Sequence, residues 1–310
     1  MPFGGRHQLT PEEGMAARVP VEHGHTDATT LMTFGFDPLL SQWSPYHGAY
    51  FAVLESLVRL AALGGDPRKA RLTFQEYFER LESDEQWGKP LSALLGGFQA
   101  QLDFSVPSIG GKDSMSGSFN DLHVPPTLVS FAVGLTTADQ VVSAVLSEPD
   151  QPVWLLPVPL DAQHLPIADR YLAQLDQIAR LRQQGLVAAQ ATVRRGGAAV
   201  SIARMCFGEQ LGFAFAAEQA DRLFQPLLGS LLIALPVGRE SQSAAAVDGA
   251  GTLADWLSQL GAIRLGQTQT GSAGFTLNHE KSATTPLVSD TFLCTADNCV
   301  PLEDALAWWQ

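Results

Sequence analysis

The chain has 310 residues, enough for two domains of ordinary size, and its 45% hydrophobic and 16% charged residues are typical of a globular protein with a sizeable core. That composition excludes a chain that is disordered throughout. The net charge of −13 and the pI near 4.9 exclude a general nucleic-acid binder, which needs a basic face, but they allow a phosphorylated small molecule held by a few local donors.

The cysteines and the N-terminus bear on the compartment. Cys206, Cys294 and Cys299 are odd in number and form no CxxC pair, which argues against a disulfide framework or a zinc site. Cys206 lies in an apolar helical pattern and is expected in the core. The N-terminus has no apolar signal-peptide region, and no run approaches the ~18 apolar residues that span a bilayer. We therefore expect a cytoplasmic protein that binds neither membrane nor nucleic acid.

Helical periodicity dominates the first third of the chain. Residues 1–26 are rich in Gly, Pro, His and charge and indicate an irregular lead-in. A helix is predicted over 45–63, because Ser44 can cap it, proline suits its first position and two glycines follow it. The segment 67–81 is ambiguous, since a helix start and a short strand both fit it.

A second helix is predicted over 90–102, where large apolar residues recur on one face. These residues are Leu91, Leu94, Leu95, Phe98 and Leu102. A short strand over 106–109 then enters a glycine-rich segment, and a β-rich run follows over 127–134. The glycine-rich segment thus lies between two expected strands.

The best linker is the segment 147–152, which contains two prolines and predicts a domain boundary near residue 150. After it strands and helices alternate, which predicts an α/β or α+β fold. The expected elements are a buried strand over 153–160, a helix over 166–184, a strand over 186–193, a helix over 197–207, strands over 211–215 and 230–236, and a helix over 253–260. The predicted domains are 1–150 and 151–270, followed by a polar tail over 271–310.

The segment IGGKDSMSG, residues 109–117, combines glycines with polar side chains. Its three glycines can take positive φ, and successive N–H groups of such a loop can form an anion-binding nest. Lys112 adds a cation, Ser114 and Ser116 add hydroxyls, and Asp113 can orient a metal or a ligand hydroxyl. These groups suit a phosphate or a phosphorylated sugar, and the alternative is a polar surface turn. The segment is not a Walker A loop, because Val106 stands where that motif needs a glycine.

Three stretches of the chain closely resemble the second synthase half of large phosphoribosylformylglycinamidine synthases. They are PSIGGKDSMSG with the following VPPTLVSF (107–117 and 124–131), WSPYHGAY (43–50) and KARLTFQEYF (69–78). The resemblance covers roughly residues 15–270. It implies an N-terminal domain like that of aminoimidazole ribonucleotide (AIR) synthase, whose sheet pairs into a barrel, and then an AIR-synthase C-terminal-like domain.

The resemblance also implies a reaction. The family makes an amidine from formylglycinamide ribonucleotide, glutamine and ATP. ATP phosphorylates the formyl amide oxygen, and ammonia then displaces phosphate. The implied cofactors are ATP or ADP and magnesium.

The resemblance assigns site residues at several positions. Glu55 matches a magnesium-binding glutamate, although its spacing alone favours a solvated or salt-bridged helix face. The residues implied to contact nucleotide or ribonucleotide are Thr73 and Gln75 at a strand end, Gly110, Gly111, Lys112, Asp113, Ser114 and Ser116 in the glycine-rich segment, and Gly196 and Gly197 in the second domain.

Two departures from the family pattern affect these assignments. Arg59 stands one helical turn after Glu55, where relatives can carry a metal-binding asparagine, and a guanidinium repels magnesium. The second domain often carries the sequence Asp-x-Ser-Asp-Gly-Gly, whose two acids are replaced here by Thr192 and Arg195, while Arg194 stands at the serine position. Gly196-Gly197 and the arginines can still bind an anion, but a degenerate nucleotide site with a structural role is the alternative.

The chain matches one synthase half, so the implied partners are a first synthase half and a glutaminase. None of the three cysteines lies in the glycine-rich turn that holds a glutaminase nucleophile. Three hypotheses stay open: a portion of the ligase that is inactive alone, a non-catalytic scaffold half, and an independent AIR-synthase-like kinase or ligase that acts as a homodimer.

Overall fold

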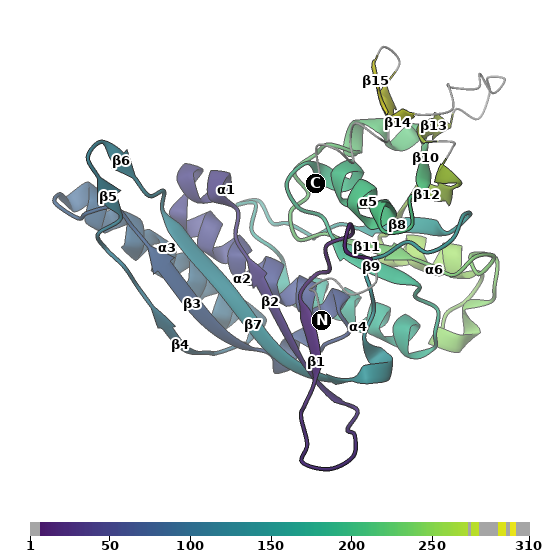
Figure 1. Ribbon diagram of the computed structural model, residues 1–310, viewed down its shortest axis with the longest axis horizontal. Helices are drawn as coiled ribbons and strands as arrows, with labels where there is room; N and C mark the ends of the chain where they lie inside the picture. The colour runs from purple at the N-terminus through teal and green to yellow at the C-terminus, as the bar shows by residue number, and fades with distance from the viewer. Residues whose placement is uncertain (1–6, 272–273, 279–290, 296–297, 302–310) are drawn as a thin grey trace. The chain divides into compact units, whose positions relative to one another are not determined.

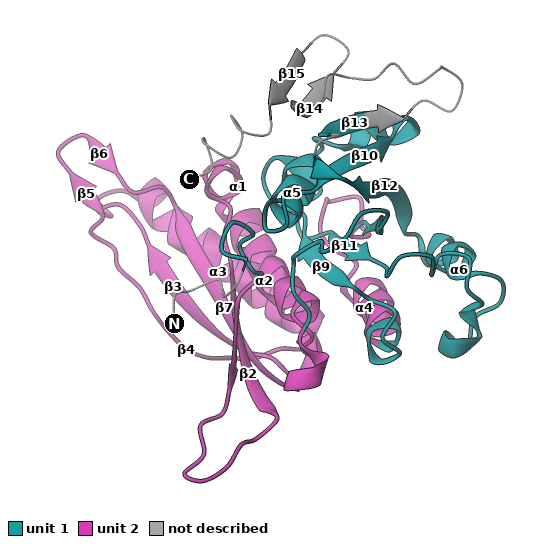
Figure 2. Ribbon diagram, turned by 45° about the vertical axis from the view of Figure 1, so that its right-hand side comes forward, with its two compact units in different colours: residues 1–12, 142–157, 180–310 teal, residues 13–141, 158–179 magenta. Residues whose placement is uncertain are grey.

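The computed structural model describes residues 7–271, 274–278, 291–295 and 298–301. The chain forms two compact units (Figure 2). Unit 2 comprises Glu13–Val141 and Val158–Ala179, and unit 1 comprises Met1–Glu12, Val142–Pro157 and Arg180–Gln310. The chain therefore crosses between units more than once, and the expected boundary near residue 150 stays a prediction. The expected tail over 271–310 lies largely outside the described residues.

Unit 2 contains a five-stranded sheet in the order β1-β2-β7-β3-β4. All neighbouring strands are antiparallel except β3 and β4, which are parallel. The strands are β1 (Met15–Arg18), β2 (Ala28–Gly35), β3 (Arg71–Tyr77), β4 (Ser108–Lys112) and β7 (Thr127–Thr137). The first strand lies inside the predicted irregular lead-in, which is therefore wrong over these residues.

Two long helices, α2 (Pro45–Ala62) and α3 (Asp84–Phe104), lie on one face of this sheet (Figure 1). The α2 helix confirms the expected one, and its Ser44 side chain accepts a hydrogen bond from the His47 N–H. The ambiguous segment holds both a 3₁₀ turn and strand β3. The smaller elements are α1 (Pro38–Trp43), the turns Pro67–Lys69 and Ala138–Gln140, and the hairpin of β5 (Ser118–Phe119) and β6 (Leu122–His123).

The strands of unit 2 alternate between a helix-covered face and an open face. Leu31, Leu72 and Ala132 face the helices and are fully buried. Met32 and Leu135, on the strand positions between them, are exposed on the open face. The sheet thus keeps one face without cover among the described residues.

Helix α3 is longer than predicted, and its apolar face is exposed. It begins six residues before the expected start, because Ser83 and Gln86 form a capping box. Its five predicted apolar-face residues are 51–58% exposed. The buried face carries small residues instead, and a side-chain carbon at Gly96 would lie 2.0 Å from the carbonyl oxygen of Tyr46. Close backbone approach at Gly96 therefore decides which face of α3 is covered.

Unit 1 contains a six-stranded sheet in the order β13-β10-β12-β8-β11-β9. Its strands are β8 (Pro152–Leu156), β9 (Ala189–Thr192), β10 (Gly212–Ala216), β11 (Leu231–Ala234), β12 (Ile263–Gln269) and β13 (Phe275–Asn278). The predicted strands are confirmed within a few residues, but β12 was not predicted. Helix α6 (Leu253–Leu260) precedes β12 and confirms the helix predicted over 253–260.

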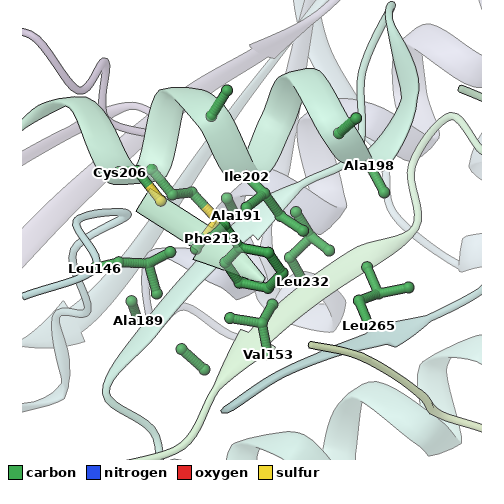
Figure 3. Close-up of a cluster of buried hydrophobic side chains, with 14 of the residues drawn as sticks. Leu146, Val153, Ala189, Ala191, Ala198, Ile202, Cys206, Phe213, Leu232 and Leu265 are labelled. Carbon is green, nitrogen blue, oxygen red and sulfur yellow. The ribbon is translucent and has the colours of Figure 1, made fainter. Parts of the chain in front are cut away.

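Helix α5 (Gly197–Phe207) packs its apolar face on this sheet. Figure 3 shows Ile202 directed at the side chains of Phe213 and Leu232, and Cys206 belongs to the same buried cluster. Cys206 is fully buried, as predicted, and burial raises the pKa of its thiol. The remaining elements are α4 (Ala168–Gln183), whose residues are divided between the units, the turns Ala217–Arg222 and Ala244–Val247, and the strands β14 (Thr291–Thr295) and β15 (Asn298–Pro301). Among the described residues, no helix combines the length and apolarity that crossing a membrane requires.

Candidate functional site

The pairing of β3 with β4 brings two of the predicted site segments together. In this parallel ladder Thr73 lies opposite Gly110, and Gln75 lies opposite Lys112. Thr73 and Gln75 occupy alternate positions of β3, on the open face of the sheet, and are half-buried. Because the two strands run in the same direction, their carboxyl ends meet at one edge, where Asp113 follows β4.

The glycine-rich segment is an edge strand that leads into a short loop, and the predicted anion nest is wrong. Gly110, Gly111 and Gly117 all have negative or extended φ rather than the left-handed values that a nest needs. The N–H groups of Ser114 and Gly117 are already used, because they donate to the carbonyl oxygens of Glu76 and Phe78 at 3.0 and 2.9 Å.

Close packing explains why two of these positions are occupied by glycine. A side-chain carbon at Gly111 would lie 2.8 Å from the carbonyl oxygen of Phe74, and one at Gly117 would lie 2.2 Å from Cγ1 of Val124. Gly110 differs, because a side-chain carbon there would meet no atom within 4 Å. The backbone is therefore open to a ligand at Gly110 alone among these three glycines.

Lys112 is an exposed cation with a defined position. Its Nζ donates to Oγ of Ser114 at 2.5 Å and lies 5.7 Å from the centre of the Tyr77 ring. Since Tyr77 belongs to the open face of β3, the ammonium group is held on the same face as Thr73 and Gln75. A cation, a serine hydroxyl and a threonine hydroxyl thus gather where a phosphate can be bound.

The carboxylate of Glu55, the predicted metal ligand, already has partners. One oxygen accepts a hydrogen bond from the N–H of Phe36 at 3.2 Å, and the other lies 3.8 Å from Nη1 of Arg59. The guanidinium also binds Glu13 and the carbonyl oxygen of Phe34. A magnesium ion would meet a buried positive charge at this position, so the residues present do not fit the metal.

The described parts of the chain offer no alternative metal centre, because they contain no cluster of three or more His, Cys, Asp or Glu side chains suited to a metal ion. The sequence prediction of magnesium in this half therefore receives no support from the geometry of the residues around Glu55.

A cavity of about 640 Å³ lies on the helix-covered side of β4. Its polar groups include Glu76 and Asp113, and burial followed by the charge of Asp113 raises the pKa of Glu76. The sequence reading missed Glu76, although strand alternation signals it: Glu76 shares with Phe74 the face that packs on the helices. The apolar walls are Phe74, Trp87, Pro90, Leu91, Leu94 and Met115.

The glycine pair of unit 1 begins helix α5. Gly196 and Gly197 have φ of 94° and 76°, values that favour glycine, and Gly196 is the residue before the first turn. The N–H of Gly197 donates to the carbonyl oxygen of Arg194, and a side-chain carbon at Gly197 would lie 2.4 Å from the carbonyl oxygen of Leu223. Tight packing therefore accounts for Gly197, and nucleotide contact at this pair stays a prediction.

Comparisons with known proteins support the fold. Neither a protein-family model nor a curated protein matches the sequence. The structure is similar to Thermotoga maritima PurL in complex with ATP, with a TM-score of 0.67 and 13% identity, and to the same protein in complex with FGAR, with a TM-score of 0.67. The match with the ATP complex covers 98% of this chain and 49% of the PurL chain.

Two smaller proteins match over nearly their whole length. A chain of the HypE–HypF complex has a TM-score of 0.59 and 15% identity, covering 93% of this chain and 96% of its own. AaThiL in complex with AMPPCP and TMP has a TM-score of 0.57 and 14% identity, covering 88% and 89%. The predicted mixed α/β, AIR-synthase-like fold is therefore confirmed, and the chain spans about half the length of PurL.

Proposed function

We propose that this chain is a second-type synthase half of phosphoribosylformylglycinamidine synthase. The ligase converts formylglycinamide ribonucleotide, glutamine and ATP to formylglycinamidine ribonucleotide, ADP, phosphate and glutamate. The observation that carries the proposal is the β3–β4 ladder, which unites the stretches 69–78 and 107–117 that resemble the family. The fold that the chain shares with PurL, over about half of that protein, supports it.

In this proposal the open edge of β3 and β4 contributes to the ribonucleotide and nucleotide site. Lys112 neutralises phosphate charge, and the hydroxyls of Ser114 and Thr73 donate hydrogen bonds to phosphate oxygens. Gln75 and Ser116 add further polar groups beside them. ATP, when bound, supplies the phosphoryl group that activates the formyl amide oxygen for attack by ammonia.

The open face of the unit 2 sheet is the proposed contact for a first synthase half. Its exposed apolar residues include Met32, Phe34 and Leu135. Exposed apolar surface of this kind marks a protein interaction site. Ammonia would come from a glutaminase, which completes the set of partners. In the absence of a first half, the same face would pair two copies of this chain.

The test is reconstitution. The chain alone is expected to show no ATP-dependent amidation, and co-expression with a first half and a glutaminase is expected to restore it. In the restored enzyme, Ser114→Ala should raise the KM for the ribonucleotide about tenfold, the loss of one hydrogen bond to a charged group. Soluble, associated partners that remain inactive would overturn the proposal.

A non-catalytic scaffold half is the second candidate, and the occupied carboxylate of Glu55 favours it. This candidate predicts no binding of ADP to the chain, with or without magnesium. Calorimetry with ADP distinguishes the ligase half from the scaffold half. A dissociation constant for ADP near 1 μM, a binding free energy of about −8 kcal/mol, is incompatible with a non-catalytic scaffold.

A further inference from the structure

The outward face of helix α3 carries a continuous row of large apolar side chains, here named the α3 stripe. It consists of Trp87, Leu91, Leu94, Leu95, Phe98 and Leu102. Each is 51–58% exposed, and their spacing places them on one side of the helix, away from the buried Gly96. The stripe extends over about 22 Å at 1.5 Å per residue.

This stripe is large enough to be an interface. Six large side chains that are half exposed present on the order of 500 Å² of apolar surface, which is near the upper end for a monomeric protein. Covering it would bury about 1,000 Å² in total, the size at which specific protein interfaces begin. A partner helix of about four turns matches its length.

The N-terminal half of the stripe opens into the cavity behind β4. Trp87, Leu91 and Leu94 belong to both the stripe and the cavity, whose volume is about 640 Å³. Glu76 and Asp113 are the acidic groups of its lining, and neither has a basic group within 4.0 Å among the described residues. The cation of the lining, Lys112, is directed to Ser114 and Tyr77 instead.

Charge decides which partner fits. Exposed Asp84 and Glu85 add two negative charges at the N-terminal end of α3, and the chain carries a net charge of −13. A second copy would bring the same acidic groups to the stripe, where like charges repel. A basic partner would instead place its charge beside carboxylates that lack a cation.

We infer that the α3 stripe and the adjoining cavity bind a basic amphipathic helix of a partner protein. Its apolar face covers the stripe, and one of its Lys or Arg side chains enters the cavity beside Glu76 and Asp113. The α3 stripe is separate from the open sheet face, and its cavity adjoins the nucleotide edge, because Gly110, Gly111 and Lys112 of β4 also line it. The inference concerns a partner helix on α3, so it goes beyond the proposed ligase function and does not depend on it.

Labelled synthetic helices of about 18 residues test the inference by fluorescence anisotropy with the full chain. The first probe has Leu at helical spacing and Lys elsewhere, the second has the same composition in scrambled order, and the third has Glu in place of Lys. The first probe should bind at least about tenfold more tightly than either of the others.

Matched variants locate the site. Phe98→Asp should weaken the first probe about tenfold or more, whereas Phe224→Asp should not, although Phe98 and Phe224 are equally exposed at 54% and 52%. The Glu76→Gln, Asp113→Asn double variant should weaken the Lys probe and bring it closer to the Glu probe. Equal binding of the scrambled probe, no loss with Phe98→Asp, or a dimer that Phe98→Asp converts to monomer would overturn the inference.

Discussion

The guanidinium of Arg59 lies 3.8 Å from the carboxylate of Glu55, one helical turn earlier on α2; Arg59 is buried and Glu55 is half-buried. Arg59 also binds the main-chain and side-chain oxygens of Glu13 and packs 4.2 Å from the centre of the Phe34 ring. A cation that belongs to the chain thus neutralises the two acids. Glu55, the residue predicted to bind a metal, therefore takes part in an ion-pair network inside unit 2.

Arg59→Met should lower the free energy of unfolding by about 3–5 kcal/mol, because it removes the cation beside the buried carboxylate of Glu13 and the half-buried carboxylate of Glu55. Urea denaturation measures the change. Arg18→Met is the control, since Arg18 forms an exposed pair with Asp27 at 3.6 Å and should lose no more than about 1 kcal/mol. Equal effects of the two substitutions would contradict this account of Arg59.

Magnesium should not stabilise the chain. A metal that binds only the folded state raises the melting temperature, so the Tm in excess magnesium and in EDTA should agree within about 1 °C. Differential scanning calorimetry checks this. A rise with magnesium that Glu55→Gln abolishes would show that Glu55 binds the metal in spite of Arg59.

The glycines of β4 should respond unequally to an added side chain. Gly111→Ala places a carbon 2.8 Å from the carbonyl oxygen of Phe74 and should cost about 1–3 kcal/mol, because β3 and β4 must move apart. Gly110→Ala meets nothing within 4 Å and should change stability by less than about 0.5 kcal/mol. Thermal unfolding of both variants measures these changes in stability. If Gly110→Ala proved the more destabilising, the pairing of β4 with β3 would be wrong.

The sequence predicted correctly those elements whose limits are set by neighbouring residues in the chain. Ser44, the following proline and the terminal glycines agree on α2, so its limits were predicted within a residue. Strand β12 was missed, because its sequence IRLGQTQ is largely polar and its place in the sheet depends on neighbours far away in the chain.

The candidate site depended even more on long-range structure. Helical spacing identified the apolar face of α3 but not its exposure, which Gly96 decides through contact with Tyr46. The glycines of the segment 109–117 were visible, but the reason for Gly111 is the neighbouring strand β3. Likewise, Arg59 was recognised as a repulsive neighbour for a metal, whereas its ion pair with the distant Glu13 needed the fold.

Glu76 should make the stability of the chain depend on pH. Burial, and then the charge of Asp113, raises the pKa of Glu76 in the folded state, so the folded chain holds this proton more tightly than the unfolded chain does. Glu76 therefore favours folding at low pH, and this contribution is lost as the pH rises through the folded pKa. Glu76→Gln should be more stable than the parent chain at pH 7, and the difference should disappear below about pH 4, near the ordinary pKa of glutamate.

Glu79 provides a control of opposite sign three residues away. A hydrogen bond from Lys89 is the main cause that lowers its pKa, so its contribution is present at neutral pH and is lost as the pH falls through the folded value. Glu79→Gln should therefore destabilise the chain at pH 7 and have little effect in acid. Urea titrations of both variants at pH 4 and pH 7 measure the two differences. If Glu76→Gln destabilised the chain at pH 7 as Glu79→Gln does, a cation would have to lie beside Glu76, and the cavity would lack the unpaired charge inferred for it.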